Sequence, residues 1–192
     1  QDLVVAIRGG VVFDENVDQK RFEFRELVET SNDNMSLASA DYDKDGDLDL
    51  YVCSYNRNLF YDSNQDSNTN ENQHAFVYHD GNNGGQNALF QNNIQGADWK
   101  FEDVTENVGL NVNNNRFSFA VSWEDYDNDG DQDLYVANDF GRDNLYRNDE
   151  GHFVDVSSQA GAEDAASGMG ITWGDYDRDG WFDIHVSNMW SS

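Results

Sequence analysis

The sequence has few basic residues, a single cysteine and no long apolar run, and each shortage excludes a class of protein. Lys and Arg number 11 against 38 Asp and Glu, which gives a formal net charge of −27. A chain this acidic repels nucleic acid and anionic membrane surfaces, so we expect neither as a partner. Cys53 is the only cysteine, which excludes an internal disulfide framework. Apolar runs are as short as residues 3–7, so no membrane span is expected.

The sequence motifs of common catalytic sites are also missing. There is no Gly-x-Ser-x-Gly nucleophile motif, no glycine-rich phosphate loop with a Lys, and no zinc-type spacing of Cys and His. The four histidines are scattered along the chain. We therefore expect no catalytic residues, no organic cofactor and a protein that is not an enzyme.

An acidic nine-residue segment is present three times, at residues 41–49, 125–133 and 175–183. Each copy has Asp at positions 1, 3, 5 and 9 and Gly at position 6, where the chain must turn sharply. Oxygen ligands that converge from alternate residues suit Ca²⁺, which accepts six to eight oxygens, better than Mg²⁺. Two unit charges at 4 Å repel by roughly 4 kcal/mol at an effective dielectric of 20, and a bound cation removes that repulsion. The repeats predict about three calcium sites.

An EF-hand begins in the same way but closes on a bidentate Glu at position 12, between two helices. Position 12 is Val52, Val136 and Val186 in the three copies. The residues before the second copy, 118–123, alternate between polar and apolar as a strand does. The pattern therefore predicts a calcium loop that joins two β-strands.

The position-9 aspartates also reveal a longer repeat. Asp2, Asp49, Asp133 and Asp183 are separated by 47, 84 and 50 residues. A unit of about 50 residues with four short strands is typical of a propeller blade. We predict an all-β fold: a partial β-propeller of about three to four blades, each a four-stranded antiparallel sheet, with calcium loops between strands one and two.

The repeat predicts one propeller segment over residues 1–192. It begins with an incomplete blade at 1–34 and continues with full blades at 35–110 and 111–160 and an incomplete blade at 161–192. The strands expected in the third unit are 117–123, 134–138, 144–148 and 152–157, and those in the second are 35–40, 50–54, 88–92 and 100–105. The step of 84 residues reflects a polar insert at about 55–87, read as a surface loop whose stretch 62–73 has no apolar side chain.

Three stretches resemble a known family: residues 125–138 (DYDNDGDQDLYVAN), 141–148 (GRDNLYRN) and 169–177 (MGITWGDYD). They are similar to FG-GAP/VCBS repeats, in particular the cartilage-acidic-protein-like branch found beside ASPIC/UnbV domains. The resemblance implies a calcium-binding propeller in a secreted or surface protein. It implies side-chain ligands at loop positions 1, 3, 5 and 9, and a backbone carbonyl ligand at position 7. The implied side-chain ligands are Asp41, Asp43, Asp45, Asp49, Asp125, Asp127, Asp129, Asp133, Asp175, Asp177, Asp179 and Asp183, and the carbonyl ligands are those of Asp47, Asp131 and Trp181.

These observations lead us to expect an extracellular or cell-surface module for adhesion, binding or assembly, with a protein or glycan partner. The alternatives are the propeller part of a secreted polysaccharide-active or redox enzyme, and a calcium buffer that needs only charge. Incomplete blades leave strand edges open to another chain. We therefore expect either a longer parent chain that supplies the missing blades or a homo-oligomer. The homo-oligomer could be a filament in which residues 168–188 of one molecule complete the blade begun at 2–29 of another.

Overall fold

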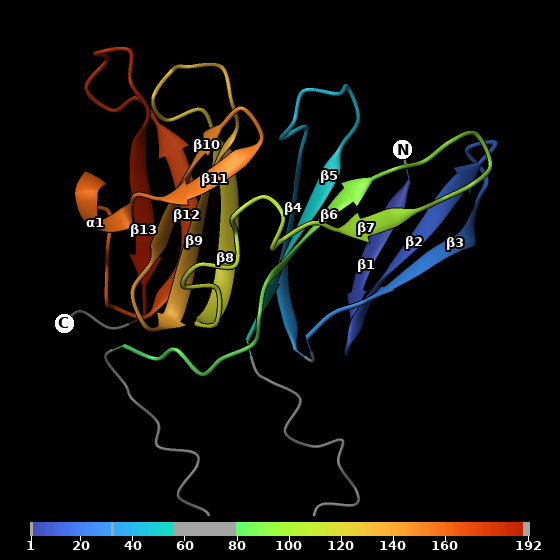
Figure 1. Cartoon of the computed structure of the whole chain (residues 1–192), viewed down its shortest axis with the longest axis horizontal. Helices are drawn as coiled ribbons and strands as arrows, with labels where there is room; N and C mark the ends of the chain where they lie inside the picture. Colours follow the sequence, from blue (N-terminus) through green and yellow to red (C-terminus); the bar gives the residue numbers. More distant parts are fainter. Residues whose placement is uncertain (1, 32, 56–79, 190–192) are drawn as a thin grey trace, which may run out of the picture.

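The computed structural model describes residues 2–31, 33–55 and 80–189, which form antiparallel β-sheets (Figure 1). The first sheet contains β1 (Leu3–Ile7), β2 (Gly10–Val17) and β3 (Arg21–Glu29). The second contains β4 (Asn34–Ala40), β5 (Asp49–Ser54), β6 (Ala88–Asn92) and β7 (Phe101–Asp103). The third contains β8 (Phe117–Glu124), β9 (Asp133–Phe140), β10 (Asn144–Asp149) and β11 (His152–Asp155). The fourth contains β12 (Gly168–Gly174) and β13 (Asp183–Asn188), and a single helical turn, α1 (Ser157–Ala160), follows β11.

The four sheets stand side by side in sequence order, as blades do (Figure 1). The first strands of successive blades are neighbours, since β8 contacts both β4 and β12. The second strand of each blade also contacts the first strand of the next, in the pairs β5 with β8 and β9 with β12. β1 contacts β4, the first strand of the next blade. This contact is the one expected of a second strand, and Asp2 before β1 aligns with the position-9 aspartates that precede strand two in the other blades. The all-β prediction is confirmed, and the sheets are consistent with propeller blades.

Apolar side chains pack between neighbouring sheets, and they do not form a single central core among the described residues. Two of the second strands, β5 and β9, are buried on both faces, and alternate residues of β5 serve different interfaces. Leu50 and Val52 pack toward the first sheet, whereas Tyr51 and Cys53 pack toward the third. Phe13 and Phe101 stack with ring centroids 3.8 Å apart across the first interface. Each blade is therefore stabilised by its neighbours, because one sheet alone leaves an apolar face exposed.

Strand four ends earlier than the sequence suggested, at Asp103 in β7 and at Asp155 in β11. The reason is a local hydrogen bond that competes with the strand ladder. Asp103 Oδ1 accepts the Thr105 N–H at 3.0 Å, and Asp155 Oδ1 accepts the Ser157 N–H at 3.1 Å. The Thr105 and Ser157 hydroxyls then accept N–H groups from strand three of their own blades. The chain therefore turns at this point in both repeats.

Part of the polar insert lies outside the described residues, including its stretch 62–73. Its end, residues 80–87, runs along the side of the sheets opposite the loops at 41–49, 125–133 and 175–183 (Figure 1). Gly84 donates its N–H to Asn115 O at 2.8 Å, and Gly85 donates to Tyr55 O at 3.0 Å. A side chain at Gly84 would meet Arg116 O at 2.3 Å, so this segment packs closely against the start of the third blade. No helix within the described ranges has the length and apolar character needed to cross a membrane.

Candidate metal sites

The three acidic loops share one backbone conformation. Position 6 has positive φ in each, at Gly46, Gly130 and Gly180, which explains the glycine. Position 4 also has positive φ, between 57° and 64°, although it is occupied by Lys44, Asn128 and Arg178. Only Asn among these three tolerates the left-handed region well. A strained backbone repeated three times indicates that the surrounding contacts impose it.

Hydrogen bonds inside the loops orient the carboxylates. The position-1 carboxylate accepts the N–H of position 6, with Asp41 receiving Gly46 at 3.2 Å and Asp125 receiving Gly130 at 2.9 Å. Position 5 accepts the N–H of position 7, as Asp129 does from Asp131 at 2.9 Å. The third loop repeats both contacts. The loop is therefore shaped by its own aspartates.

Three carboxylates converge in every loop, with ligand atoms within 4.8 Å of one another. The groups are Asp41, Asp43 and Asp45 in the first loop, Asp125, Asp127 and Asp133 in the second, and Asp175, Asp177 and Asp183 in the third. The structure thus brings together positions 1 and 3 in all three loops, with position 5 in the first and position 9 in the others. Asp49, Asp129 and Asp179 lie outside these closest groups, and their direct contact with a metal stays a prediction.

The position-9 aspartate has a structural task as well. Asp133 is fully buried, and its two oxygens accept the N–H groups of Tyr126 at 3.0 Å and Asn148 at 2.8 Å. Asp49 makes the same pair of contacts, with Tyr42 at 3.4 Å and Asn92 at 2.9 Å. Burial raises the pKa of Asp49 and Asp133 to about 7 each, and these hydrogen bonds oppose the shift only in part. A cation nearby would hold such carboxylates in the charged form.

Sequence reasoning missed the asparagine that closes strand three. The Asn92 side chain donates to Leu48 O at 3.2 Å, and the buried Asn148 side chain donates to Gln132 O at 3.1 Å. Asn148 also donates to Tyr42 O of the neighbouring blade at 2.8 Å, so it connects two metal loops. The available signal was the shared Leu-x-x-Asn pattern of residues 89–92 and 145–148. In the first blade, Asn16 N–H donates to Asp2 at 2.9 Å, which places Asp2 as a position-9 residue.

Unpartnered buried oxygens test whether a cation fits these loops. Asp41 Oδ1, Asp47 Oδ1 and Asp127 Oδ1 are buried and accept no hydrogen bond from the described residues. Burial and the charges of Asp129 and Asp125 raise the pKa of Asp127. Native structures rarely leave buried carboxylate oxygens unsatisfied unless an ion or water takes the place of a donor. Hard oxygen donors in this number suit Ca²⁺, and the residues present fit that ion.

The position-7 side chains differ between the loops. In the second loop, the Asp131 carboxylate accepts the Glu150 N–H at 2.9 Å and forms an ion pair with Lys44 of the first loop. The Lys44 ammonium lowers the pKa of Asp131. In the first loop, burial and nearby aspartates raise the pKa of Asp47. The third loop has the exposed Trp181 at this position. The metal contact of the position-7 carbonyl oxygens stays a prediction.

Two tryptophans, Trp123 and Trp173, precede the second and third loops and pack between blades. Trp123 meets Tyr51 of the second blade edge to face, with ring centroids 6.2 Å apart. Trp173 meets Tyr135 of the third blade in the same way, also at 6.2 Å. Aromatic pairs of this geometry contribute beyond their buried area. They hold the strands that enter the second and third loops against the preceding blade.

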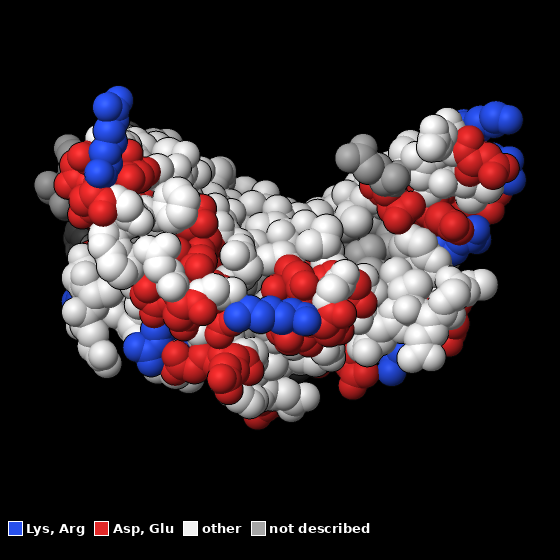
Figure 2. All heavy atoms as spheres, turned by 90° about the horizontal axis from the view of Figure 1, so that it is seen from above, with Lys and Arg blue, Asp and Glu red and all other residues white. Residues whose placement is uncertain are grey.

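The loops lie on one face of the molecule, at the upper ends of the sheets in Figure 1. Figure 2 views this face from above, and acidic side chains gather on it in several separate patches with few basic side chains among them. Closely spaced like charges favour cation binding, since a bound ion offsets their repulsion. The face is therefore suited to several separate cations rather than to one large anionic ligand.

Comparison with known proteins agrees with this geometry over part of the chain. A search of curated proteins found no match. A scan against protein-family models matched the FG-GAP-like repeat over residues 125–186. The matched stretch begins at the first residue of the second acidic loop and ends within β13, so it covers the second and third loops. Residues 125–186 thus form an FG-GAP-like repeat region whose acidic clusters could bind metal ions.

Proposed function

We propose that this protein is a calcium-binding β-propeller module that acts outside the cell in adhesion, binding or assembly. The observation that carries the proposal is the threefold repetition of one loop, with the same positive-φ positions and three converging carboxylates each. A random acidic surface has no reason to repeat a strained backbone. A calcium buffer that needed only charge would not require this spacing either.

Calcium is proposed to stabilise the fold as well as to occupy the loops. Each loop joins strands one and two of a blade, and in the first two loops the position-9 aspartate also holds strand three through the N–H of Asn92 or Asn148. An ion that binds the folded state alone adds ~2.7 kcal/mol per site at 100 times its dissociation constant. Extracellular modules bind calcium at roughly 10⁻⁴ to 10⁻³ M, which is the basis for proposing an extracellular location.

The test is thermal unfolding of the whole chain in chelator, in Ca²⁺ and in Mg²⁺. We expect chelation to lower the melting temperature and Ca²⁺ to restore it at concentrations where Mg²⁺ does not. The reason is that Mg²⁺ requires six ligands in near-ideal octahedral geometry at shorter metal–oxygen distances. Titration calorimetry should give about three ions per chain, one for each carboxylate group. A melting curve that chelator leaves unchanged would refute the proposal.

We further propose that the module has no catalytic activity of its own, because its sequence has no recognised nucleophile or acid–base motif. A panel of neutral and acidic polysaccharides, incubated with the calcium-loaded protein, tests this. Sustained turnover that one point substitution abolishes would favour the enzyme alternative instead.

A further inference from the structure

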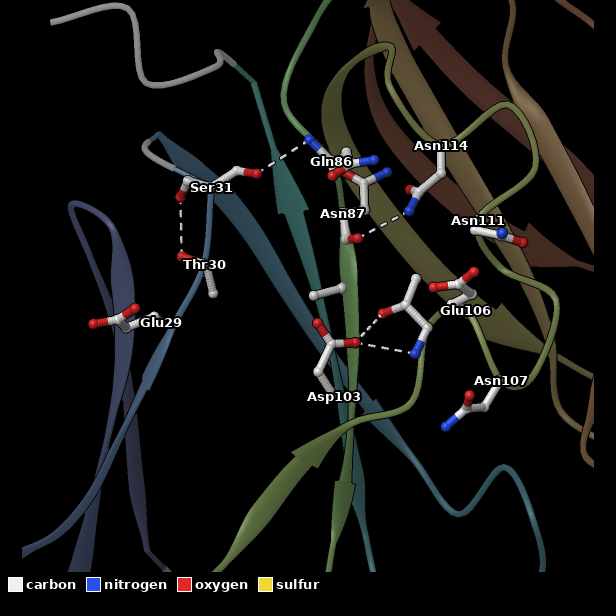
Figure 3. A pocket seen from close by; sticks show the side chains of 12 residues that line it. Glu29, Thr30, Ser31, Gln86, Asn87, Asp103, Glu106, Asn107, Asn111 and Asn114 are labelled. Carbon is white, nitrogen blue, oxygen red and sulfur yellow. Dashed lines mark hydrogen bonds between the residues drawn. The ribbon is translucent and has the colours of Figure 1, made fainter. Parts of the chain in front are cut away.

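Two pockets beside the second blade differ in character. In the pocket that Figure 3 shows, polar groups bond one another: Asn114 Nδ2 donates to Asn87 O at 2.9 Å, and the Gln86 N–H donates to Ser31 Oγ at 3.2 Å. The other pocket lies between the first and second sheets, and most of the side chains that line it are apolar. Its volume is about 480 Å³, which falls within the range of small-molecule sites.

The internal repeat explains why space is left at this second pocket. Where the second and third sheets meet, Tyr51 and Trp123 pack edge to face with ring centroids 6.2 Å apart, and the same pair recurs at the next interface. The tyrosine stands two residues after a position-9 Asp, and the tryptophan stands two residues before a position-1 Asp. Where the first and second sheets meet, these two positions hold Val4 and Ser39. Two large rings are therefore replaced by two small side chains.

Strand pairing confirms that these positions are equivalent. Ser39 is paired with Leu50 on β5, as Trp123 is paired with Leu134 on β9. Each of these leucines directly follows a position-9 Asp. Val4 and Ser39 come from different sheets, and both line the pocket. The pocket therefore lies at the place that the two rings fill at the following interface.

The walls of this pocket are accessible. Val4 is 36% exposed and Ser39 is exposed as well, whereas Tyr51, at the position that corresponds to Val4, is fully buried. Trp99 and Phe101 line the same pocket and are only partly buried. An apolar space left by missing side chains is poorly suited to water and is stabilised when an apolar molecule enters it.

The charged residues at the pocket decide which ligands it rejects. Asp2 and Asp49 line it, and none of the described lining residues is Lys, Arg or His. Asp49 is fully buried, and its two oxygens already accept the N–H groups of Tyr42 and Asn92. Asp2 is exposed at the pocket. An anionic ligand would be repelled, so the charge of the lining favours a ligand without a carboxylate or phosphate.

We propose that the pocket between the first and second sheets binds a free aromatic molecule of the size of indole that carries no negative charge. Its ring takes the place that Trp123 occupies at the following interface, and it packs against Val4, Trp99 and Phe101. Edge-to-face contacts with these rings add to the burial of apolar surface. Such a ligand contacts both sheets, so it stabilises their interface. The proposal does not require metal in the loops.

The first experiment titrates the calcium-saturated protein with indole and with indole-3-acetate, its anionic counterpart, and follows ¹³C-methyl spectra. We expect indole to shift the methyl signals of Val4 and Leu50. Indole-3-acetate should bind at least about tenfold more weakly, because Asp2 and the net charge of −27 repel its carboxylate. Equal binding of the anion, or shifts by indole that leave Val4 and Leu50 unchanged, would overturn the proposal.

The second experiment fills the pocket from the chain itself. Ser39→Trp should weaken indole at least about tenfold and raise the melting temperature without ligand, because the new ring occupies the space. Trp123 holds the same position before the second loop, so a tryptophan there is compatible with the loop. Ser158→Trp, at an exposed position on α1 that does not line the pocket, is the control and should change indole affinity less than about twofold. Unchanged indole affinity in Ser39→Trp would refute the site.

The third experiment makes the reciprocal change and does not depend on the folding of Ser39→Trp. Trp123→Ser removes the ring between the second and third sheets, which should lower the melting temperature. Indole should recover part of this loss and should give a new shift at Val121, which packs in that interface. If indole produces no such shift, a free ring does not replace the missing side chain and the proposal is wrong.

Calcium binding separates this proposal from the proposed function. Titration calorimetry should give the same number of calcium ions for Ser39→Trp as for the parent, because Ser39 lies outside the acidic loop at residues 41–49. Loss of indole binding with unchanged calcium binding is therefore the expected result for this variant. Failure of the indole tests would leave the calcium function standing, and failure of the calcium test would leave the pocket unaffected.

Discussion

At the scale of single residues, a substitution at Asp127 can test metal binding without disturbing the hydrogen bonds that shape the loop. Its Oδ1 is buried without a hydrogen-bond donor among the described residues, whereas Asp125 at position 1 uses both oxygens to hold the backbone. Substitution of Asp127 therefore removes a candidate ligand and leaves the hydrogen bonds of Asp125 in place.

We predict that Asp127→Asn weakens calcium at one site by on the order of tenfold or more, since a charged ligand is lost. In chelator the same variant should be as stable as the parent or slightly more stable, because Asp129 and Asp125 repel the Asp127 charge and burial disfavours it. Calorimetry and melting curves with and without Ca²⁺ measure both effects. Asp98→Asn is the charge-matched control on an exposed loop. Identical titrations of the two variants would show that Asp127 is not a ligand.

Asp143 is a buried carboxylate outside the metal loops, and it makes stability depend on pH. It is fully buried, and it accepts the Asn138 N–H at 2.7 Å and the Tyr135 hydroxyl at 3.2 Å. Burial raises its pKa from 3.8 to about 7. The folded state therefore holds this proton more tightly than the unfolded state. Stability from this group is present at low pH and is lost as pH rises toward and through 7.

We predict that, as pH rises from 5 to 8, the free energy of unfolding of the parent protein falls by on the order of 2 kcal/mol more than that of the Asp143→Asn variant. Asn keeps an acceptor for Asn138 and offers a donor to the Tyr135 oxygen, whose hydroxyl also donates to Ala162 O at 2.9 Å. Urea unfolding at saturating calcium gives the two curves. Asp49 and Asp133 titrate in both the parent and the variant, so the difference between the two pH curves is due to Asp143. Parallel curves for parent and variant would contradict the raised pKa.

At the scale of elements, the ion pair between Lys44 and Asp131 connects two adjacent metal loops. Lys44 is half exposed, whereas the Asp131 side chain is 8% exposed, so loss of the ammonium leaves a nearly buried carboxylate unpaired. Exposed ion pairs contribute little to folding stability. This pair has one exposed and one nearly buried partner, so it is intermediate between an exposed and a buried ion pair. The hydrogen bond to Asp131 raises the pKa of Lys44, and the charges of Asp129 and Asp125 raise it further.

We predict opposite effects of Lys44→Met on stability and on calcium affinity. The free energy of unfolding in chelator should fall, because the Asp131 carboxylate loses its ion-pair partner. Calcium at the second loop should bind a few times more tightly at low salt, because a nearby positive charge is removed, and this gain should vanish at high salt. Asp131→Asn in the Lys44→Met background should recover stability. A loss of calcium affinity in Lys44→Met at low salt would contradict this account.

At the scale of the whole molecule, both ends of the row of sheets expose apolar side chains. Phe22, Phe24 and Leu27 of β3 are about half exposed at one end, and Trp181 and Phe182 are exposed at the other. Patches of this kind mark interaction surfaces. Sheet completion, the mode expected from the sequence, stays a prediction. In it both ends would contribute a second strand, since β1 follows Asp2 and β13 begins at Asp183. One sheet made from both ends would have five strands instead of four.

We propose that these two faces pack in the manner of neighbouring blades, against further blades of a longer chain or, in the 192-residue chain by itself, against each other. Sedimentation of the calcium-bound protein should show mass that increases with concentration, since head-to-tail contacts that do not close into a ring grow. Phe22→Ser with Phe24→Ser should reduce this growth, while Val154→Ser, at an exposed apolar position on β11, should not. A strictly monomeric parent at high concentration would rule the proposal out.

The amino-acid sequence alone determined the repeat, the strand pattern and the acidic loops of this protein. These features are local: the glycine at position 6 sets the turn, and the alternation around residues 118–123 sets the strand. The tertiary structure decided which carboxylates converge: position 9 joins positions 1 and 3 in the second and third loops, whereas position 5 joins them in the first. It also decided the pairing of Lys44 with Asp131, because these two residues belong to different blades. Contacts between blades depend on how the sheets stack, and no spacing within one repeat encodes that arrangement.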